Sequence, residues 1–411
     1  MIFQIKESRE YRLNLYYIIA QGLYWMMVCC TISMGSAYLS NRGYSTVGIG
    51  ALFAIAFLVA TVLQQVVSYL TDKASSFDVV DVLALLGAIV TLDLFFAIGT
   101  NSKGFGTSFT FFIGAMVATV IQPFLNALNF HIEKYNVKMN FGVARASGSF
   151  FFFIMSLLAG NFMTLTTERA VTILGFVVSA TFVVVIILIY RELKYSGIEI
   201  QDDYDPFLDE SKDNSFSLEL VKTFIDKYEM FFVFLIGVVC FYFGHVLINN
   251  FLYQITVNVG GNEASNGGLL ALQAIVELPA MIFFNQLKDK FGSIKLLGVS
   301  AIFYLAKILV TTLATSVGLL YFSMLFQALA FAIFIPASVH FVDEIMNKQD
   351  AVKGQAFVTI AMTFSNLLSS LLGGVLIRII GATPTLWFGT IITFIGVVIA
   401  IFGLAKICEN N

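Results

Sequence analysis

The stretch LNLYYIIAQGLYWMMVCCTISMGSAYLSN at positions 13–41 contains no Asp, Glu, Lys or Arg. After Arg42, a second uncharged stretch, GYSTVGIGALFAIAFLVATVLQQVVSYLT, occupies positions 43–71. Each is longer than the roughly 20 apolar residues that an α-helix needs to cross about 30 Å of hydrocarbon. The sequence therefore predicts two consecutive helices that span a membrane.

The composition of the whole chain agrees with this prediction. Of the 411 residues, 58% are hydrophobic and 12% are charged, which is about half the charged fraction of an average soluble domain. So few charges cannot cover the surface of a soluble protein of this length, which excludes soluble enzymes and nucleic-acid binders. The sequence has no HExxH motif and no nucleophile elbow, so an integral-membrane enzyme is not expected either.

No metal site or cofactor is expected. The four cysteines fall in or beside apolar stretches, without the spacing of metal ligands or of a disulfide framework. They are Cys29, Cys30, Cys240 and Cys408.

Apolar stretches between polar segments predict an all-α membrane protein with twelve spans. Their expected ranges are 13–40, 46–71, 78–98, 107–132, 142–164, 169–190, 230–256, 267–287, 294–313, 316–342, 354–378 and 383–405. If both termini face the cytoplasm, seventeen of the 23 Lys and Arg residues lie on the cytoplasmic side, against three outside: Arg42, Lys103 and Arg169. Because positive residues favour the inner side, we expect a multi-pass protein of the cytoplasmic membrane with both termini inside.

The longest polar stretch divides the chain into two halves. It covers 191–229 and holds 16 charged residues, with an acidic run at 202–210. We expect a six-helix half at 1–190, a solvated cytoplasmic linker at 191–229 and a second six-helix half at 230–411. The linker ends in FSLELVKTFIDKYE (216–229), which places Phe216, Leu220, Phe224 and Tyr228 on one helical face. This pattern predicts an amphipathic helix in the membrane interface.

A weak internal repeat relates the two halves. The turn SYLTDKASS (68–76) follows the second span, and NQLKDKFGSIK (285–295) follows the eighth, so that Asp72-Lys73 recurs as Asp289-Lys290. A second pair of segments matches in the same way: FGVARASGS (141–149) lies between the fourth and fifth spans, and KGQAFVTIA (353–361) lies between the tenth and eleventh. The repeat predicts two pseudo-symmetric halves with the same orientation in the membrane.

Twelve spans, a central polar loop and paired Asp-basic turns resemble the major facilitator superfamily. The segments AYLSNRGYSTVGIGAL (37–52), FGVARASGS and ELPAMIFFNQLKDKFG (277–292) are similar to the branch that holds lactose permease, other oligosaccharide–proton symporters and phenylpropionate permease. The resemblance implies a monomeric secondary transporter that takes up an oligosaccharide or related solute with protons, by alternating access. Two alternatives stay open: a proton-antiport exporter, and a membrane sensor that does not transport.

The paired turns predict gates. An acid–base turn at the equivalent end of each half can bridge helices when the cytoplasmic side is closed and separate when it opens. We therefore expect gating by Asp72, Lys73, Asp289 and Lys290.

Two opposite charges are expected near the membrane midplane. Glu277 precedes the turn between the eighth and ninth spans, and Lys307 follows it, each by a distance that places it roughly 15 to 18 Å deep. An ionisable group at that depth must be paired or hydrated. We expect the two to pair across the helical hairpin, either as a structural ion pair or as part of a substrate or coupling site.

Arg145 is the candidate for holding the solute, because a guanidinium offers several fixed donors to hydroxyl or carboxylate groups. In the lactose permease family, the Arg of the FGVAR motif holds sugar hydroxyls together with a carboxylate on the fourth span. The IEK run at 132–134 places Asn129 at that second position here. Snorkelling of Arg145 to the interface, or pairing with Glu133, is the structural alternative.

Amides and aromatics in apolar spans complete the expected binding site. Gln21 and Trp25 are spaced to lie on one helical face, and the seventh and eighth spans supply an amide-rich wall, with helix packing as the alternative use. The members of this wall are Asn249, Asn250, Tyr253, Gln254 and Gln273.

The proton carriers are expected among few groups. The lactose permease family carries ionisable residues in the tenth span, but the corresponding positions here are Ala328, Phe331 and Phe334. Glu277, His245 and His340 are the remaining candidates. Asp93, near the end of the third span, is expected to be interfacial.

Overall fold

The computed structural model describes residues 2–73, 78–194 and 218–410, and these residues form helices and turns with no strand. Within them, twelve helical segments are long and apolar enough to cross a membrane, as the sequence predicts. The spans run over Arg9–Ser33, Thr46–Thr71, Val79–Ile98, Phe105–Glu133, Phe141–Leu165, Arg169–Lys194, Glu229–Asn250, Glu263–Ile282, Ser293–Thr312, Val317–Ile345, Lys348–Ile380 and Ala382–Glu409.

The helices carry the following labels and bounds. They are α1 (Ile2–Val28), the π-helical segment η1 (Cys29–Ser33), α2 (Gly35–Asn41), α3 (Thr46–Lys73), α4 (Val79–Ile98), α5 (Phe105–Glu133), α6 (Phe141–Leu165), α7 (Arg169–Lys194), α8 (Leu218–Lys227), α9 (Glu229–Asn250), α10 (Leu252–Asn258), α11 (Glu263–Ile282), α12 (Phe284–Phe291), α13 (Ser293–Thr312), α14 (Val317–Leu325), the 3-10 turn η2 (Phe326–Ala328), α15 (Phe331–Ile345), α16 (Lys348–Ile380) and α17 (Ala382–Asn410).

Four of the expected spans are interrupted rather than continuous. The first passes from α1 through η1 into α2, and the seventh breaks at Phe251 between α9 and α10. The eighth breaks at Phe283 between α11 and α12, and the tenth breaks at η2 between α14 and α15. An apolar run does not reveal such breaks, because hydropathy reports burial in lipid and not the hydrogen-bond ladder. Irregular backbone at membrane depth is tolerated where protein buries it or where it lines a cavity.

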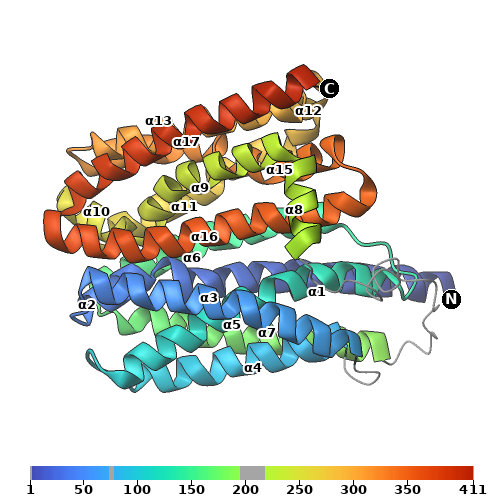
Figure 1. The fold of residues 1–411 in the computed structure, drawn as a ribbon. Helices are drawn as coiled ribbons and strands as arrows, with labels where there is room; N and C mark the ends of the chain where they lie inside the picture. Colours follow the sequence, from blue (N-terminus) through green and yellow to red (C-terminus); the bar gives the residue numbers. More distant parts are fainter. Residues whose placement is uncertain (1, 74–77, 195–217, 411) are drawn as a thin grey trace.

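The helices form two layers (Figure 1). One layer contains α1 to α7, and the other contains α9 to α17. They pack together mainly through α3 against α16 and α6 against α11. Glycine permits the close approach, since a Cβ added to Gly160 would lie 2.9 Å from the Cα of Gly267, and one on Gly50 only 2.1 Å from the carbonyl oxygen of Ser370. Small residues at helix interfaces are typical of membrane bundles.

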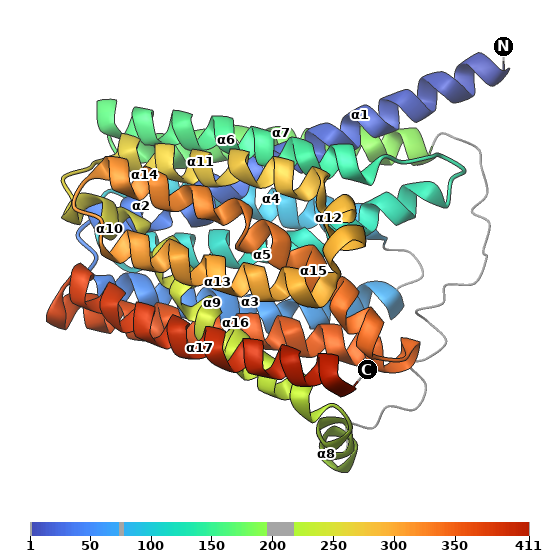
Figure 2. The ribbon, with the colours of Figure 1, turned by 90° about the horizontal axis from the view of Figure 1, so that it is seen from above.

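Hydrogen bonds between the layers gather at the end of the bundle opposite the termini. Asn41 Nδ2 donates to Glu263 Oε1 at 2.8 Å, and the Tyr253 hydroxyl lies 3.0 Å from Asn41 Oδ1 and 2.7 Å from Glu263 Oε1. Thr46 Oγ1 donates to the carbonyl of Gly374 at 2.7 Å. Both chain termini lie at the other end (Figures 1 and 2). The layers are thus tied together at one end.

Helix α8 lies at the end with the termini and runs across the direction of the spans (Figures 1 and 2). Phe224 is buried and stacks on Phe357 of α16, with ring centroids 5.6 Å apart. Lys227 Nζ contacts Asp350 Oδ2 at 2.6 Å. Phe224 therefore packs on protein, whereas the sequence places it in the membrane interface. The side chains of Phe216 and Leu220 and the acidic run 202–210 lie outside the described residues, and the domain boundaries remain predictions.

Candidate functional site

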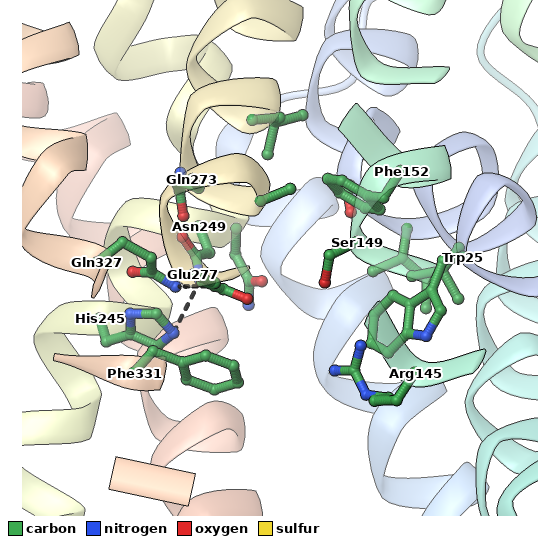
Figure 3. Close-up of a pocket in the computed structure, with 16 residues that line it drawn as sticks. Trp25, Arg145, Ser149, Phe152, His245, Asn249, Gln273, Glu277, Gln327 and Phe331 are labelled. Atoms are coloured by element: carbon green, nitrogen blue, oxygen red, sulfur yellow. Dashed lines mark hydrogen bonds between the residues drawn. The ribbon is translucent and has the colours of Figure 1, made fainter. Parts of the chain in front are cut away.

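A central cavity of about 250 Å³ lies between the two layers (Figure 3). Trp25, Arg145, Ser149 and Phe152 line it from the N-terminal layer. The C-terminal layer contributes a more polar wall that consists of His245, Asn249, Asn250, Gln273, Glu277, Gln327 and Phe331. Facing aromatic and polar groups around a concave space are typical of small-molecule sites.

Arg145 stands on the N-terminal wall, with its guanidinium carbon 4.6 Å from the centroid of the Trp25 ring. The indole fits because Gly148 is one helical turn further along α6: a Cβ at Gly148 would lie 2.3 Å from the ring. Phe152 packs edge-on against the same indole. The cation–π contact fixes the direction of Arg145, and its guanidinium points toward the cavity (Figure 3).

A chain of three side chains backs the opposite wall. Lys307 is fully buried, and its Nζ donates to Gln327 Oε1 at 2.7 Å and to Gln273 Oε1 at 3.3 Å. Gln327 Nε2 in turn donates to Glu277 Oε1 at 2.8 Å. The expected direct pairing of Glu277 with Lys307 is therefore wrong, because Gln327 lies between them. Sequence reasoning missed Gln327, although a glutamine in an otherwise apolar stretch is a visible signal.

Several polar atoms on this wall have no partner within the described chain. His245 stacks on Phe331, and its Nε2 lies 3.0 Å from Asn249 Nδ2. His245 Nδ1, Asn249 Oδ1 and Gln273 Nε2 are buried and unpaired. Buried polar groups are nearly always hydrogen-bonded in native proteins. Unpaired donors and acceptors around a cavity therefore fit a bound polar solute or ordered water.

A second cavity of about 470 Å³ continues from the first toward the termini. The two share Trp25, Val28 and Ile32 as lining residues. Its far part is lined by Gln64 of α3 and Gln355 of α16, which lie toward the ends of these helices nearest the termini. The space between the layers therefore extends away from the end at which they are hydrogen-bonded together.

Five predicted binding residues do not line the central cavity: Lys307 lies behind its wall, and Gln21, Asn129, Tyr253 and Gln254 lie elsewhere. Gln21 is buried and donates to the Tyr17 hydroxyl and to Asn126. Asn129 is also buried and donates to Glu133 at 3.4 Å, so the structure does not bring it together with Arg145 at the cavity.

Tyr253 and Gln254 belong to the contacts between the layers, with Gln254 Nε2 donating to the carbonyl of Ser36. The spacing from Asn249 to Tyr253 predicts one helical face, but the break at Phe251 turns the later residues away. Asn250 does line the cavity, and it also donates to Ser370 and Asn366.

The predicted gate residues and His340 lie near the end with the termini. Asp289 is exposed and contacts Lys288 at 3.7 Å, within its own helix. Lys73 and Lys290 lie over the rings of Tyr69 and Phe291 respectively, and the side chain of Asp72 lies outside the described residues. His340 stacks on Phe284, away from the central cavity. None of these contacts bridges the layers in this conformation.

Comparisons with known proteins agree on the family and the fold. The model of the MFS_1 like family matches residues 17–388, whereas a search of curated proteins finds no match. Among solved structures, a nucleoside transporter NupG mutant is 16% identical with a TM-score of 0.76, covering 97% of this chain and 99% of that one. The POT family transporter PepTSo is 11% identical with a TM-score of 0.72, covering 97% and 98%.

A third similar structure was solved in an inward-facing conformation. It is a bacterial homolog of the human lysosomal transporter Spinster, inward-facing and unoccupied, with 12% identity, a TM-score of 0.68 and coverage of 99% of this chain and 98% of that one. Identities this low show the shared fold alone.

Proposed function

The chain belongs to the MFS_1 like family, and on that premise we propose that it is a secondary active transporter that moves a small organic solute by alternating access. The observation that carries the proposal is the cavity between the layers, where Arg145 faces a polar wall with three atoms that no described residue pairs: His245 Nδ1, Asn249 Oδ1 and Gln273 Nε2. The two layers are hydrogen-bonded together at the end opposite the termini, and the cavity extends toward the end with the termini. Because the termini are predicted to be cytoplasmic, this arrangement suits an inward-facing state.

The lining favours a solute with a ring and several hydroxyl groups. Trp25, Phe152 and Phe331 offer faces and edges for a ring. Asn249 and Gln273 offer one acceptor and one donor that no described residue uses. A sugar meets these requirements, as the resemblance to oligosaccharide symporters suggests, and so does a nucleoside, the substrate class named for one of the similar structures.

Uptake with protons across the cytoplasmic membrane, by a monomer, is the proposed mode. Each half moves as one six-helix unit, divided by the linker at 191–229. Export by proton antiport is the second candidate, because the same cavity serves both directions.

A ligand panel tests the proposed solute class. Purified protein is heated with monosaccharides, disaccharides, nucleosides and aromatic acids, and the unfolding temperature is measured for each. We expect stabilisation by one sugar or nucleoside class, in proportion to ligand concentration, and a smaller effect in Arg145→Lys. Stabilisation by aromatic acids alone would reject the polyhydroxyl class, and Arg191→Lys, exposed and far from the cavity, is the matched control.

A further inference from the structure

A second buried carboxylate lies outside the central cavity. Asp93 on α4 is 7% exposed, and its Oδ2 has no hydrogen-bond partner among the described residues. It lines a separate small cavity of about 20 Å³ together with Thr31, Tyr38 and Thr110, which is room for about one water molecule. Helices α2, α5 and α7 and the segment η1 cover Asp93, a feature that its expected place near the interface does not reveal.

Among the described residues, no Lys, Arg or His lines the cavity of Asp93. Arg42 lies over the Tyr38 ring at 4.4 Å and its Nε donates to Glu168 at 3.2 Å, while its Nη2 is buried without a described partner. The other titratable side chains that line the small cavity are Cys30 and Tyr38, and neither supplies a cation. A carboxylate buried without a counter-charge is costly. Glu277 differs, because it accepts a hydrogen bond from Gln327 in the wall opposite Arg145.

Polar groups lead from Asp93 toward the end of the bundle opposite the termini. The Tyr38 hydroxyl is buried without a described partner. Arg42 covers its ring, and Glu168, the partner of Arg42, is 17% exposed. A proton that enters from the water on that side therefore meets the carboxylate of Glu168 first, and the Tyr38 hydroxyl lies in the same small cavity as Asp93.

The segment η1 connects the small cavity with the central one. Cys30 and Thr31 line the cavity of Asp93, whereas Ile32 and Ser33, the next two residues, line the central cavity. The packing around the carboxylate is tight, since a Cβ on Gly114 would lie 3.0 Å from Asp93 Oδ2. A π-helical turn inside a helix frequently marks a functional site. A change of charge at Asp93 thus acts on a backbone segment that also shapes the solute cavity.

We propose that Asp93 is the coupling site of the transporter: its carboxylate takes up one proton from the side of Glu168, and η1 transmits the change to the central cavity. The proton adds to a carboxylate oxygen from the side of Glu168 and leaves from the same oxygen toward the cytoplasmic side when the protein faces inward, so that one proton crosses the membrane in each cycle. This assignment rests on the proposed transport function, and it replaces Glu277, His245 and His340 as the proton carrier.

The fluorescence of Trp25 reports this coupling without any solute. The chain has two tryptophans, so Trp387→Phe leaves Trp25, which lines the central cavity three residues before the end of α1. Emission is recorded against pH in lipid nanodiscs. We expect a single protonation transition that persists in Glu277→Gln, moves its midpoint in Tyr38→Phe and disappears in Asp93→Asn. A transition that survives unchanged in Asp93→Asn would overturn the proposal.

Infrared spectroscopy provides a second readout, in which the wild-type spectrum alone does not depend on the folding of that variant. We expect the wild-type spectrum to contain a pH-dependent carbonyl stretch of a protonated carboxyl group, which Asp93→Asn removes and Glu277→Gln keeps. A wild-type spectrum without such a band at any pH would overturn the proposal, as would a band displaced by sodium and not by choline, which would assign a sodium site. Neither readout needs a transported solute, so failure of the solute assignment leaves both results interpretable.

Discussion

Lys307 and Glu277, the two opposite charges beside the central cavity, are joined through the side-chain amide of Gln327 and not by direct contact. The three groups come from α13, η2 and α11, so one amide from the break in the tenth span ties three elements together. The amide oxygen accepts a hydrogen bond from the Lys307 ammonium, and the amide N–H donates one to the Glu277 carboxylate, so that both charged groups have a partner.

Replacing this amide should destabilise the protein. In Gln327→Leu, the buried Lys307 loses its shorter hydrogen bond and Glu277 loses its described donor. We expect a loss of about 1 to 3 kcal/mol, the range for an unsatisfied buried polar partner, measured as a lower unfolding temperature in detergent. Gln122→Leu, in the second cavity, is the control. An unfolding temperature equal to that of the wild type would show that the bridge contributes nothing.

Removing both charges should be milder than removing one. Glu277→Gln leaves Lys307 without a nearby counter-charge, whereas Glu277→Gln combined with Lys307→Met leaves no buried charge behind. The double variant should therefore unfold at a higher temperature than Glu277→Gln alone. Additive losses in the two single variants and the double variant would indicate that the two side chains are not energetically coupled.

Arg145→Lys should weaken solute binding. A compact ammonium cannot reproduce the several fixed donors of a guanidinium stacked on Trp25. Loss of a hydrogen bond to a charged group corresponds to about 1.5 to 3 kcal/mol, or roughly 10- to 150-fold in Kd. Titration of a solute found in the ligand panel measures this change. Unchanged affinity would assign Arg145 to helix packing.

Widening the contact between α6 and α11 should open the end opposite the termini. A Cβ on Gly160 would already lie 2.6 Å from the carbonyl oxygen of Glu263, so Gly160→Val forces the layers apart there. In a cysteine-free background with Ser33→Cys as the cavity probe, we expect faster labelling by an impermeant thiol reagent from that side. Gly298→Val, where no atom lies within 4 Å of an added Cβ, is the control. Equal labelling in both variants would show that the contact between α6 and α11 does not close this end.

Asp289 tests the gate at the end of the bundle where the termini lie. It is exposed and contacts Lys288 within its own helix here, which is the state expected of an open gate. Asp289→Asn should stabilise this open state by removing the bridge that forms on closure, and thereby raise the reactivity of a cysteine at Gln355, which lines the second cavity. Unchanged reactivity and transport would remove Asp289 from gating.

The sequence predicts those features of the fold that burial in lipid alone determines. Long uncharged runs specify the twelve spans, and charged or amide residues within them identify Arg145, Asn249, Gln273 and Glu277 as cavity groups. Backbone breaks carry no comparable signal in an apolar run. The break at Phe251 therefore displaces Tyr253 from the predicted wall, and the break at η2 brings Gln327 between two charges.

Asp93 shows a second limit, because distance from a helix end does not reveal lateral cover. It lies five residues before the end of α4, and helices α2, α5 and α7 and the segment η1 cover it from the sides.

Uptake into proteoliposomes tests the central claim most directly. Wild-type protein and Ser149→Trp, which fills the central cavity from α6, are reconstituted and given the labelled solute that stabilises the protein best, with and without an imposed proton gradient. The account predicts accumulation above equilibrium by the wild type, driven by the gradient, and no transport by Ser149→Trp in spite of normal folding. Equal uptake by liposomes with and without the wild-type protein, for a solute that binds it, would contradict the claim that the protein is a transporter.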